Sequence, residues 1–409
     1  MSPISPITRA LRELLPRLSP VSTEEVDHGS ATGRVLGEPL RADRDSPPSS
    51  VSAMDGYACR LSDVASGRVP VAGEARIGEP PAELPPGAAL RIFTGGCVPL
   101  GAEAVIRRED VDETVNPIVI RDPAAVRPGE NIRRQGENLR AGQEVIPAGT
   151  LMHAPAAAAL ATFGCCRPVV YRRVRLGVLV TGDELAVVAD QPPPWRIRDS
   201  NGPALAAMFG ATPWIEVAAT ARCVDDLPGL TAALCRLLED CDAVFLTGGV
   251  SRGDHDHVPA AVAAAGGSVV FHRLPIRPGR PILGALGPAG QAILGLPGNP
   301  VSVMVTARRF GVPVLRRLAG CAQAEEPPAL VRVGGPSRRA ADVWWCQPVR
   351  MERDGLAVLI DSRGSGDVVG AARSDGFIEV PPAGAHACDE AALPAHPSGA
   401  LFSFWTWRA

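Results

Sequence analysis

The feature that most constrains the fold is a regular alternation of short apolar runs and helical segments from residue 172 to about residue 310. Each run lacks polar alternation, which is typical of strands that are buried on both faces of a sheet. Such an alternation predicts a mostly parallel sheet with helices on both faces. The expected strands are 174–180, 214–218, 243–246, 269–273, 282–285 and 292–296, and the expected helices are 201–210, 227–238, 258–265 and one from about 301.

Glycine-containing turns follow three of these expected strands. The turns begin at Thr181, Thr247 and Pro297, each at the point where its strand ends. In open sheets of this class, ligands bind beyond the carboxyl ends of the strands. Three such turns are far less expected by chance than one, so we predict a ligand site at this edge of the sheet.

The second turn carries residues suited to phosphate and to a divalent cation. Gly248 and Gly249 allow a sharp turn whose N–H groups point at a ligand. Asp254 and Asp256 follow, and their carboxylates are hard oxygen ligands of the kind that Mg²⁺ prefers. Taken alone, the stretch is equally compatible with an ordinary glycine-rich turn. A zinc site at His255–His257 is disfavoured, because no further ligands occur at a suitable spacing.

The third turn, Gly295–Ser302, combines stiff and permissive positions. Pro297 and Pro300 stiffen it, and Gly298 allows the backbone to open. Asn299 is expected to cap the following helix, whose N-terminus attracts anions. The turn therefore predicts a place for a phosphate.

Arg277 and Arg280 lie just before this segment on a rigid turn that contains two prolines. Two cations there suit phosphate or another oxyanion better than a neutral ligand. The alternative is a pair of exposed arginines on a loop. All 41 basic residues counted as Lys or Arg are Arg, so a site that uses Lys elsewhere must use Arg here.

The remainder of the chain reads as two smaller β regions. Residues 69–126 show short apolar runs between Gly and Pro turns, as in a small β domain. Before it, a simple Asp55-Gly56 turn is favoured, and presentation of Asp55 to a ligand is the alternative. Thr94 follows a strand in another Thr-Gly-Gly sequence, and it either binds phosphate or caps a turn. Beyond residue 320, short β-like runs predict a small β barrel or sandwich.

The composition indicates which partners and which cellular compartment to expect. Apolar residues make up 46% of the chain and the formal net charge is −3, so neither nucleic acid nor an anionic membrane is expected as a partner. No apolar run reaches 18 residues, and the N-terminus lacks the features of a signal peptide. The ten cysteines include no CxxC pair, which favours reduced thiols in a cytoplasmic protein.

Seven motifs together indicate a family. They are SAMDGYA (52–58), FTGG (93–96), TGDEL (181–185), DSN (199–201), TGGVSRGDHD (247–256), RPGRP (277–281) and GLPGNPVS (295–302). In this order they resemble the MoeA family of molybdopterin molybdenumtransferases over nearly the whole chain. The resemblance implies a multi-domain α/β plus β fold. Its expected parts are an elongated N-terminal domain (1–44 and 140–171), a small β domain (45–139), a MogA-like α/β domain (172–320) and a C-terminal β barrel (321–409).

The resemblance also implies a reaction and an assembly. The family inserts molybdate into adenylylated molybdopterin in a Mg²⁺-dependent step and releases AMP. The implied protein is a cytoplasmic homodimer whose active site lies between the α/β domain of one subunit and the small β domain of the other. A transient contact with molybdopterin adenylyltransferase is expected as well.

Matching the motifs residue by residue carries the family's functional positions onto this chain. Catalytic roles are implied for Asp55, Thr94, Glu184, Asp225 and Asp256, with Glu184 and Asp256 also expected to hold Mg²⁺. Substrate binding is implied for the residues of the turns: Gly248, Gly249, Ser251, Arg277, Arg280, Pro297, Gly298, Asn299, Pro300 and Ser302.

The chain departs from the family pattern at a few positions. Asn138 stands where Asp is usual, Arg277 and Arg280 replace Lys, and Arg252 replaces a small or apolar residue. Two alternatives therefore stay open. One is the same reaction with tungstate, and the other is a non-catalytic dimer that binds molybdopterin or acts as a scaffold.

Overall fold

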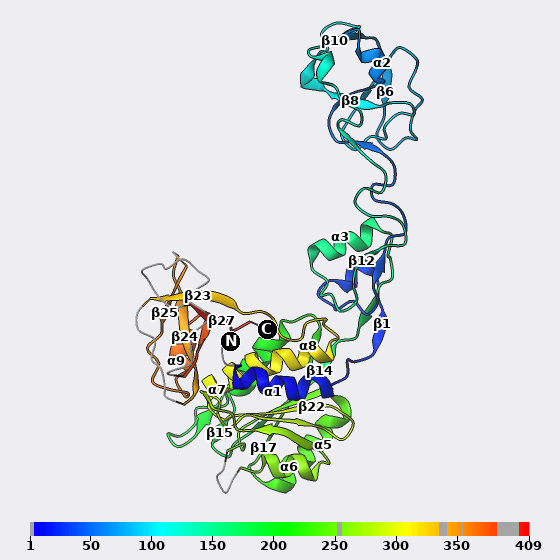
Figure 1. Cartoon of the computed structure of the whole chain (residues 1–409). Helices are drawn as coiled ribbons and strands as arrows, with labels where there is room; N and C mark the ends of the chain where they lie inside the picture. The colour runs from blue at the N-terminus through cyan, green and yellow to red at the C-terminus, as the bar shows by residue number, and fades with distance from the viewer. Residues whose placement is uncertain (1–3, 252–255, 335–341, 354, 383–400, 409) are drawn as a thin grey trace. The chain divides into compact units, whose positions relative to one another are not determined.

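The computed structural model describes residues 4–251, 256–334, 342–353, 355–382 and 401–408 (Figure 1). Contacts divide the chain into two compact units. The first, here called the α/β unit, comprises Met1–Glu38, Ala148–Ala157 and Arg167–Ala409. The second, here called the β unit, comprises Pro39–Pro147 and Ala158–Cys166. No helix in the described part of the chain has both the length and the apolar character needed to cross a membrane.

A six-stranded sheet in the order β17-β14-β18-β22-β21-β19 forms the centre of the α/β unit. Its first four strands run parallel, and β21 is antiparallel to both of its neighbours. The predicted mostly parallel sheet is therefore confirmed. The strands are β14 (Val174–Thr181), β17 (Ile215–Cys223), β18 (Ala243–Thr247), β19 (Ser268–His272), β21 (Leu283–Leu286) and β22 (Ala292–Leu296).

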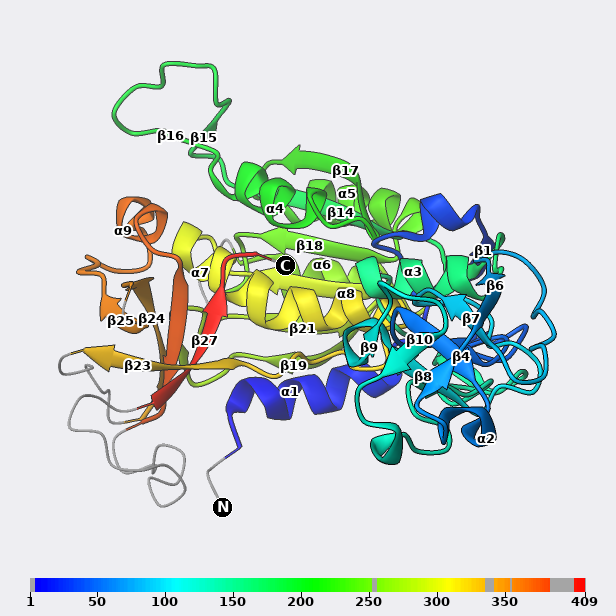
Figure 2. The same cartoon turned by 90° about the horizontal axis from the view of Figure 1, so that it is seen from above.

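Helices cover both faces of this sheet because successive strand residues point to opposite faces (Figure 2). Val178 and Val180 of β14 pack in one core with residues of α1, α4 and α8. Leu179, between them, packs in a second core with residues of α5 and α6. The helices are α1 (Pro6–Leu14), α4 (Asn201–Gly210), α5 (Leu227–Asp240), α6 (Val258–Ala264), α7 (Pro300–Thr306) and α8 (Val312–Leu318).

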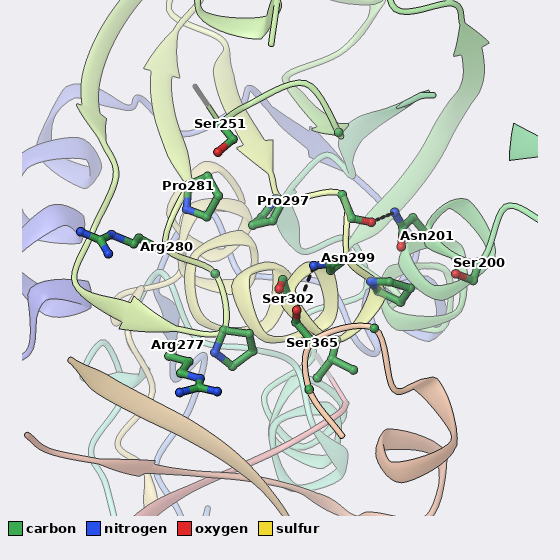
Figure 3. Close-up of a pocket in the computed structure, with 18 of the residues that line it drawn as sticks. Ser200, Asn201, Ser251, Arg277, Arg280, Pro281, Pro297, Asn299, Ser302 and Ser365 are labelled. Carbon is green, nitrogen blue, oxygen red and sulfur yellow. Dashed lines mark hydrogen bonds between the residues drawn. The ribbon is translucent and has the colours of Figure 1, made fainter. Parts of the chain in front are cut away.

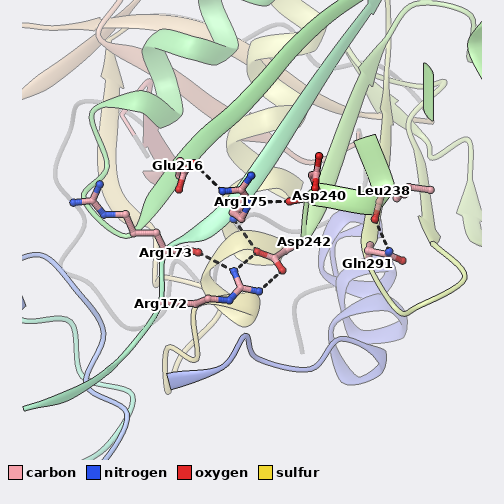
Figure 4. A network of polar contacts seen from close by, with 8 residues as sticks. All are labelled: Arg172, Arg173, Arg175, Glu216, Leu238, Asp240, Asp242 and Gln291. Carbon is pink, nitrogen blue, oxygen red and sulfur yellow. Dashed lines mark hydrogen bonds and ion pairs between the residues drawn. The ribbon is translucent and has the colours of Figure 1, made fainter. Parts of the chain in front are cut away.

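A polar network holds the amino ends of the parallel strands together (Figure 4). The carboxylate of Asp242 accepts hydrogen bonds from the Nη1 and Nη2 atoms of Arg172 at 2.7 and 2.6 Å. It also accepts one from the backbone N–H of Arg175 at 2.8 Å. The Arg175 side chain bonds the carbonyl of Asp240 and pairs with Glu216 at 3.1 Å. These contacts fix the amino ends of β14, β17 and β18, opposite the glycine turns that follow β14 and β18.

The C-terminal part of the α/β unit is a five-stranded barrel, as predicted. Direct pairing of β24 with β26 closes it. The short strand β20 (Ile276–Arg277) pairs in parallel with β24, which ties the segment carrying Arg277 to the barrel. The barrel elements are β23 (Ala329–Gly334), β24 (Trp344–Met351), β25 (Leu356–Leu359), α9 (Val368–Ala372), β26 (Gly376–Val380) and β27 (Leu401–Thr406).

A buried ion pair joins the barrel to the helices. A π-helical turn, Ala307–Gly311, connects α7 to α8 and carries Arg309. The Arg309 guanidinium pairs with Glu379 of β26, and both side chains are less than a tenth exposed. Its carbon also lies 3.9 Å from the ring centroid of Trp405 on β27. Because each charge has a partner, burying them together is tolerated.

The β unit is built on a four-stranded sheet in the order β6-β7-β4-β8 and a three-stranded sheet in the order β5-β10-β9. The short apolar runs within residues 69–126 form strands, but the Asp55-Gly56 dipeptide is not the simple turn that the sequence favoured. Gly56 instead begins β4, an inner strand of the larger sheet. The elements are β4 (Gly56–Cys59), α2 (Leu61–Val64), β5 (Arg68–Val69), β6 (Val71–Ala75), β7 (Ala89–Ile92), β8 (Ala104–Arg107), β9 (Val111–Asp112) and β10 (Ile118–Ile120).

Short strand pairs and α3 (Ala154–Thr162) complete the described α-helices and strands. The division into four domains stays a prediction. The remaining pairs are β1 (Thr23–Glu25) with β13 (Val169–Tyr171), β2 (Leu40–Arg41) with β12 (Glu144–Ile146), β3 (Val51–Ser52) with β11 (Ile132–Arg133), and β15 (Leu185–Ala186) with β16 (Ile197–Arg198).

Candidate functional site

The three glycine turns of the α/β unit meet in one pocket of about 1710 Å³ at the carboxyl ends of β14, β18 and β22 (Figure 3). Residues of the barrel also line this pocket. Every predicted site residue of the α/β unit lines it: Glu184, Asp225, Gly248, Gly249, Ser251, Asp256, Arg277, Arg280, Pro297, Gly298, Asn299, Pro300 and Ser302. The structure thus brings these residues together, while their individual roles stay predictions.

Buried side-chain oxygens without partners lie at this end of the sheet. The Oγ1 atoms of Thr181 and Thr247 and the Oδ1 atom of Asn201 have no hydrogen-bond partner among the described residues. Thr181 and Asn201 line the pocket, and both are less than a tenth exposed. Buried polar atoms are nearly always satisfied. A polar ligand in the pocket could provide these missing partners.

The second turn needs glycine for its conformation. The φ angles of Gly248 and Gly249 are +92° and +60°, in the region that disfavours other residues. A Cβ atom at Gly248 would also lie 2.9 Å from the carbonyl oxygen of Thr181. One expectation is wrong, since the Gly248 N–H donates to the carbonyl of Leu296 at 3.2 Å and is not free for a ligand.

The third turn is fixed by two side-chain amides. The Nδ2 atom of Asn201 donates to the carbonyl of Gly298 at 2.8 Å. Asn299 occupies the N-cap position of α7, but its side chain makes no capping bond, contrary to expectation. Its Nδ2 atom donates instead to the Oγ of Ser365, on the loop after β25, at 2.9 Å. The turn is thereby joined to the barrel.

The side chain of Asp199 holds the start of α4, which follows Ser200. The Oδ1 atom of Asp199 accepts hydrogen bonds from the backbone N–H groups of Asn201 and Gly202, both at 3.0 Å. Because Asp199 performs the capping, the amide of Asn201 remains available for the third turn. Figure 3 shows Ser200 and Asn201 on one side of the pocket and Arg277, Arg280 and Pro281 on the other.

The cationic turn borders the barrel. The Arg277 guanidinium carbon lies 4.5 Å from the ring centroid of Trp345, so the aromatic ring supports it. Within the described residues, neither Arg277 nor Arg280 makes an ion pair with a carboxylate. Both side chains line the pocket and are largely exposed. Two unneutralised cations at a pocket wall can bind an oxyanion.

Carboxylates supply the opposite charge. Glu184 is exposed and Asp225 and Asp256 are half-buried at the pocket lining. Burial, reinforced by the charges of Asp225, Asp226 and Asp183, raises the pKa of the neighbouring Cys223 thiol to about 11. The negative charge of these carboxylates therefore also acts on the Cys223 thiol beside the pocket.

The donor set suits Mg²⁺ held jointly with a substrate. In the part of the chain that the structure describes, no group of three His, Cys, Asp or Glu side chains is arranged so that it could hold a metal ion by itself. Mg²⁺ commonly binds one or two carboxylates and completes its shell with substrate phosphates and water. Glu184 and Asp256 both line the pocket, so their carboxylates are candidates for such a role. Asp254 and Arg252, also singled out in the sequence, lie outside the described residues.

The β unit brings together the two remaining predicted residues. The Oδ1 atom of Asp55 accepts hydrogen bonds from the backbone N–H and the Oγ1 of Thr94, each at 2.8 Å. Both residues are exposed. The two hydrogen bonds from Thr94, followed by the charges of Arg108 and Arg91, lower the pKa of Asp55. The sequence indicated each residue separately, but nothing in their spacing predicted this direct contact.

Comparison with known proteins assigns the family. The MoeA N-terminal region (domain I and II) matches residues 5–164, and the family described as "Probable molybdopterin binding domain" matches residues 177–317. A molybdopterin molybdenumtransferase of Nostoc sp. is 39% identical over 330 residues, which cover 77% of this chain and 74% of the relative. The chain belongs to the MoeA family of molybdopterin molybdenumtransferases.

Other MoeA relatives agree with this assignment. A molybdopterin molybdenumtransferase of Haemophilus influenzae is 34% identical over 313 residues, covering 76% of both chains. The crystal structure of a molybdopterin biosynthesis MoeA protein from Pyrococcus horikoshii matches over the whole of both chains with a TM-score of 0.75 and 26% identity. The resemblance read from the motifs is confirmed, and the protein is an enzyme of this family.

Sequence reasoning missed the barrel's share of the pocket. Ser365 and Trp345 lie far along the chain from the glycine turns, and only the Gly- and Ser-rich run at 362–366 marked a loop there. Asn138, the departure from the MoeA pattern, lies in the β unit. Its Oδ1 accepts a hydrogen bond from Arg133 at 2.8 Å, a contact that Asp would make equally well.

Proposed function

We propose that the protein inserts molybdate into adenylylated molybdopterin in a Mg²⁺-dependent step of molybdenum cofactor biosynthesis and releases AMP. The observation that carries the proposal is one pocket that collects carboxylates, unneutralised arginines and buried oxygens without partners at the carboxyl ends of three parallel strands. The shared name of the relatives, molybdopterin molybdenumtransferase, supports the same reaction.

Each group has a role that its chemistry supports. Mg²⁺ bound by Glu184 and Asp256 would neutralise charge on the substrate phosphates. Arg277 and Arg280 are proposed to hold the molybdate oxyanion, since a guanidinium donates two parallel hydrogen bonds to such a group. The glycine turns and the N-terminus of α7 are proposed to hold the phosphate of the pterin.

The acting form is proposed to be a homodimer with two composite sites. The predicted catalytic residues are divided between the two units, with Asp55 and Thr94 in the β unit and the others in the α/β unit. We propose that the β unit of one subunit supplies Asp55 and Thr94 to the pocket of its partner. Adenylylated molybdopterin would be received through transient contact with molybdopterin adenylyltransferase. The cytoplasmic location stays a prediction.

The direct test is AMP release from adenylylated molybdopterin in the presence of Mg²⁺ and molybdate. The wild-type protein is expected to release AMP, and removal of Mg²⁺ by a chelator is expected to stop the reaction. Asp55→Asn and Glu184→Gln are each expected to reduce the rate by about a hundredfold or more, because each removes a charge without changing shape.

Matched measurements separate the rival functions. Replacing molybdate by tungstate measures the oxyanion preference directly. A wild-type protein that binds the substrate but releases no AMP with either oxyanion would contradict the transferase proposal and favour a scaffold. Arg44→Gln, an exposed substitution in the β unit outside the predicted site, serves as the control and should keep the wild-type rate.

A further inference from the structure

Arg91 stands beside the Asp55–Thr94 pair without an anionic partner. It lies on β7, three residues before Thr94, and its half-buried side chain packs on Phe93, with the guanidinium carbon 5.1 Å from the ring centroid. Its charge lowers the pKa of both Asp55 and Glu113, so the guanidinium lies within electrostatic reach of both. It nevertheless forms no hydrogen bond or ion pair with any described residue.

The neighbouring Arg108 shows the opposite arrangement. Its guanidinium pairs with Glu113, with Nε 2.6 Å from Oε1. The second oxygen of Glu113 accepts a hydrogen bond from the buried Tyr57 hydroxyl at 2.7 Å. Both carboxylate oxygens of Glu113 are therefore occupied by Arg108 and Tyr57. Glu113 neutralises one arginine and leaves the other as a free cation.

The cross-strand neighbours of Arg91 do not neutralise it either. Arg91 lies opposite Tyr57 on β4 and opposite Glu74 on β6. Glu74 is exposed and makes no ion pair with Arg91 within the described part of the chain. None of the Arg91 nitrogens is among the buried atoms that lack a partner in the described residues, so these donors are open to water or to a ligand. Asp55, which lies within electrostatic reach of Arg91, accepts no hydrogen bond from described residues at its Oδ2 atom.

We infer that Arg91 is a substrate-binding residue, which donates two hydrogen bonds to an anionic phosphate group of the adenylylated pterin. The inference rests on the proposed function, since it uses the same substrate and the same Asp55–Thr94 pair. The ring of Phe93 and the neighbouring strands hold the guanidinium in place before the substrate arrives. Glu113 and Tyr57 keep Arg108 engaged, so the phosphate meets one free arginine at this position.

The test measures binding without turnover. Adenylylated molybdopterin is titrated calorimetrically into the full-length protein in the absence of Mg²⁺ and molybdate. Arg91→Gln is expected to weaken binding by roughly tenfold to a hundredfold, the loss typical of one charge-assisted contact. Arg91→Lys is expected to weaken it by about threefold to tenfold, because a single ammonium replaces the two-donor guanidinium. Raising the salt concentration should reduce the difference between wild type and Arg91→Gln.

Arg68→Gln is the matched control, since it removes the same charge from an exposed position on β5, in the other sheet of the β unit. It should bind as the wild type does. Unchanged affinity in Arg91→Gln overturns the inference even if the wild type releases AMP normally. If Arg91→Gln does not fold, unchanged affinity in Arg91→Lys overturns it instead. If the wild type releases no AMP but Arg91→Gln clearly weakens substrate binding, the result would contradict the proposed reaction and leave the Arg91 inference standing.

Discussion

At the scale of single residues, Thr94 controls the charge of Asp55. Its backbone N–H and its hydroxyl both donate to the same carboxylate oxygen, and these bonds lower the pKa of Asp55. The lowered pKa keeps the Asp55 carboxylate ionised at more acidic pH than an ordinary Asp would be. The interaction favours the folded state at pH values above the unfolded pKa of Asp55 and is lost as pH falls through the folded pKa.

Thr94→Val tests this control. The variant keeps the backbone donor and loses the hydroxyl, so the pKa of Asp55 should rise toward its ordinary value. If the reaction requires the ionised Asp55 carboxylate, the acid limb of the pH–rate profile should move to higher pH. The rate near neutral pH should fall less than the rate at acidic pH. Thr94→Ser, which retains the hydroxyl, should restore the wild-type profile. An unchanged acid limb in Thr94→Val would show that Asp55 is not the group that sets it.

The sequence predicted which residues matter better than it predicted what they touch. Gly248 and Asn299 were predicted to serve the pocket, and the structure places both there. Their contacts were assigned wrongly, because a local pattern cannot reveal partners distant in sequence. The Gly248 N–H meets Leu296, and the Asn299 amide meets Ser365, 66 residues away.

At the scale of elements, the close pairing of β4 with β8 positions Asp55. A Cβ atom at Gly56 would lie only 1.9 Å from the carbonyl oxygen of Ile106 on β8. The glycine is therefore required by the approach of another strand. Its φ angle is not in the left-handed region, unlike that of Gly95, which is +83°. The N–H of Arg108, just after β8, also bonds the carbonyl of Asp55 at 3.0 Å.

Gly56→Ala should separate β4 from β8. The expected cost is about 3 kcal/mol or more, since the added methyl group meets backbone that cannot move aside. Gly95→Ala is the comparison: its Cβ meets nothing within 4 Å, so only the backbone strain of about 1 kcal/mol applies. Hydrogen exchange of the β4 and β8 amides would report both changes. Equal protection in the two variants would contradict the steric account.

Strand and helix positions of the α/β unit were largely readable from the sequence. Buried runs such as Ala243–Thr247 carry a strong signal because both of their faces are covered. The alternation predicted that most strands run parallel, but the order of the strands and the reversed direction of β21 carry no such signal. The antiparallel insertion of β21 and the pairing of β20 with β24 depend on contacts between distant segments. The same limit hid β4, whose Asp55-Gly56 start resembles a turn.

At the scale of the whole molecule, the proposed reaction draws on residues of both units. The α/β unit provides a pocket with cations and carboxylates, and the β unit provides the Asp55–Thr94 pair. Neither unit alone contains all of the predicted catalytic residues. The family resemblance predicted that the catalytic residues are divided between two parts of the chain. Composition and periodicity did not predict it, because residues far apart in sequence that act together leave no local pattern.

The most direct test of the account is complementation between two inactive variants. Asp55→Asn and Glu184→Gln subunits carrying different affinity tags are coexpressed, and mixed dimers are purified through both tags. If each site combines the β unit of one subunit with the pocket of the other, one of the two sites in a mixed dimer contains no substitution. AMP release should then recover to roughly half of the wild-type rate per dimer. Mixed dimers as inactive as their parents, or no complex carrying both tags, would contradict the composite site.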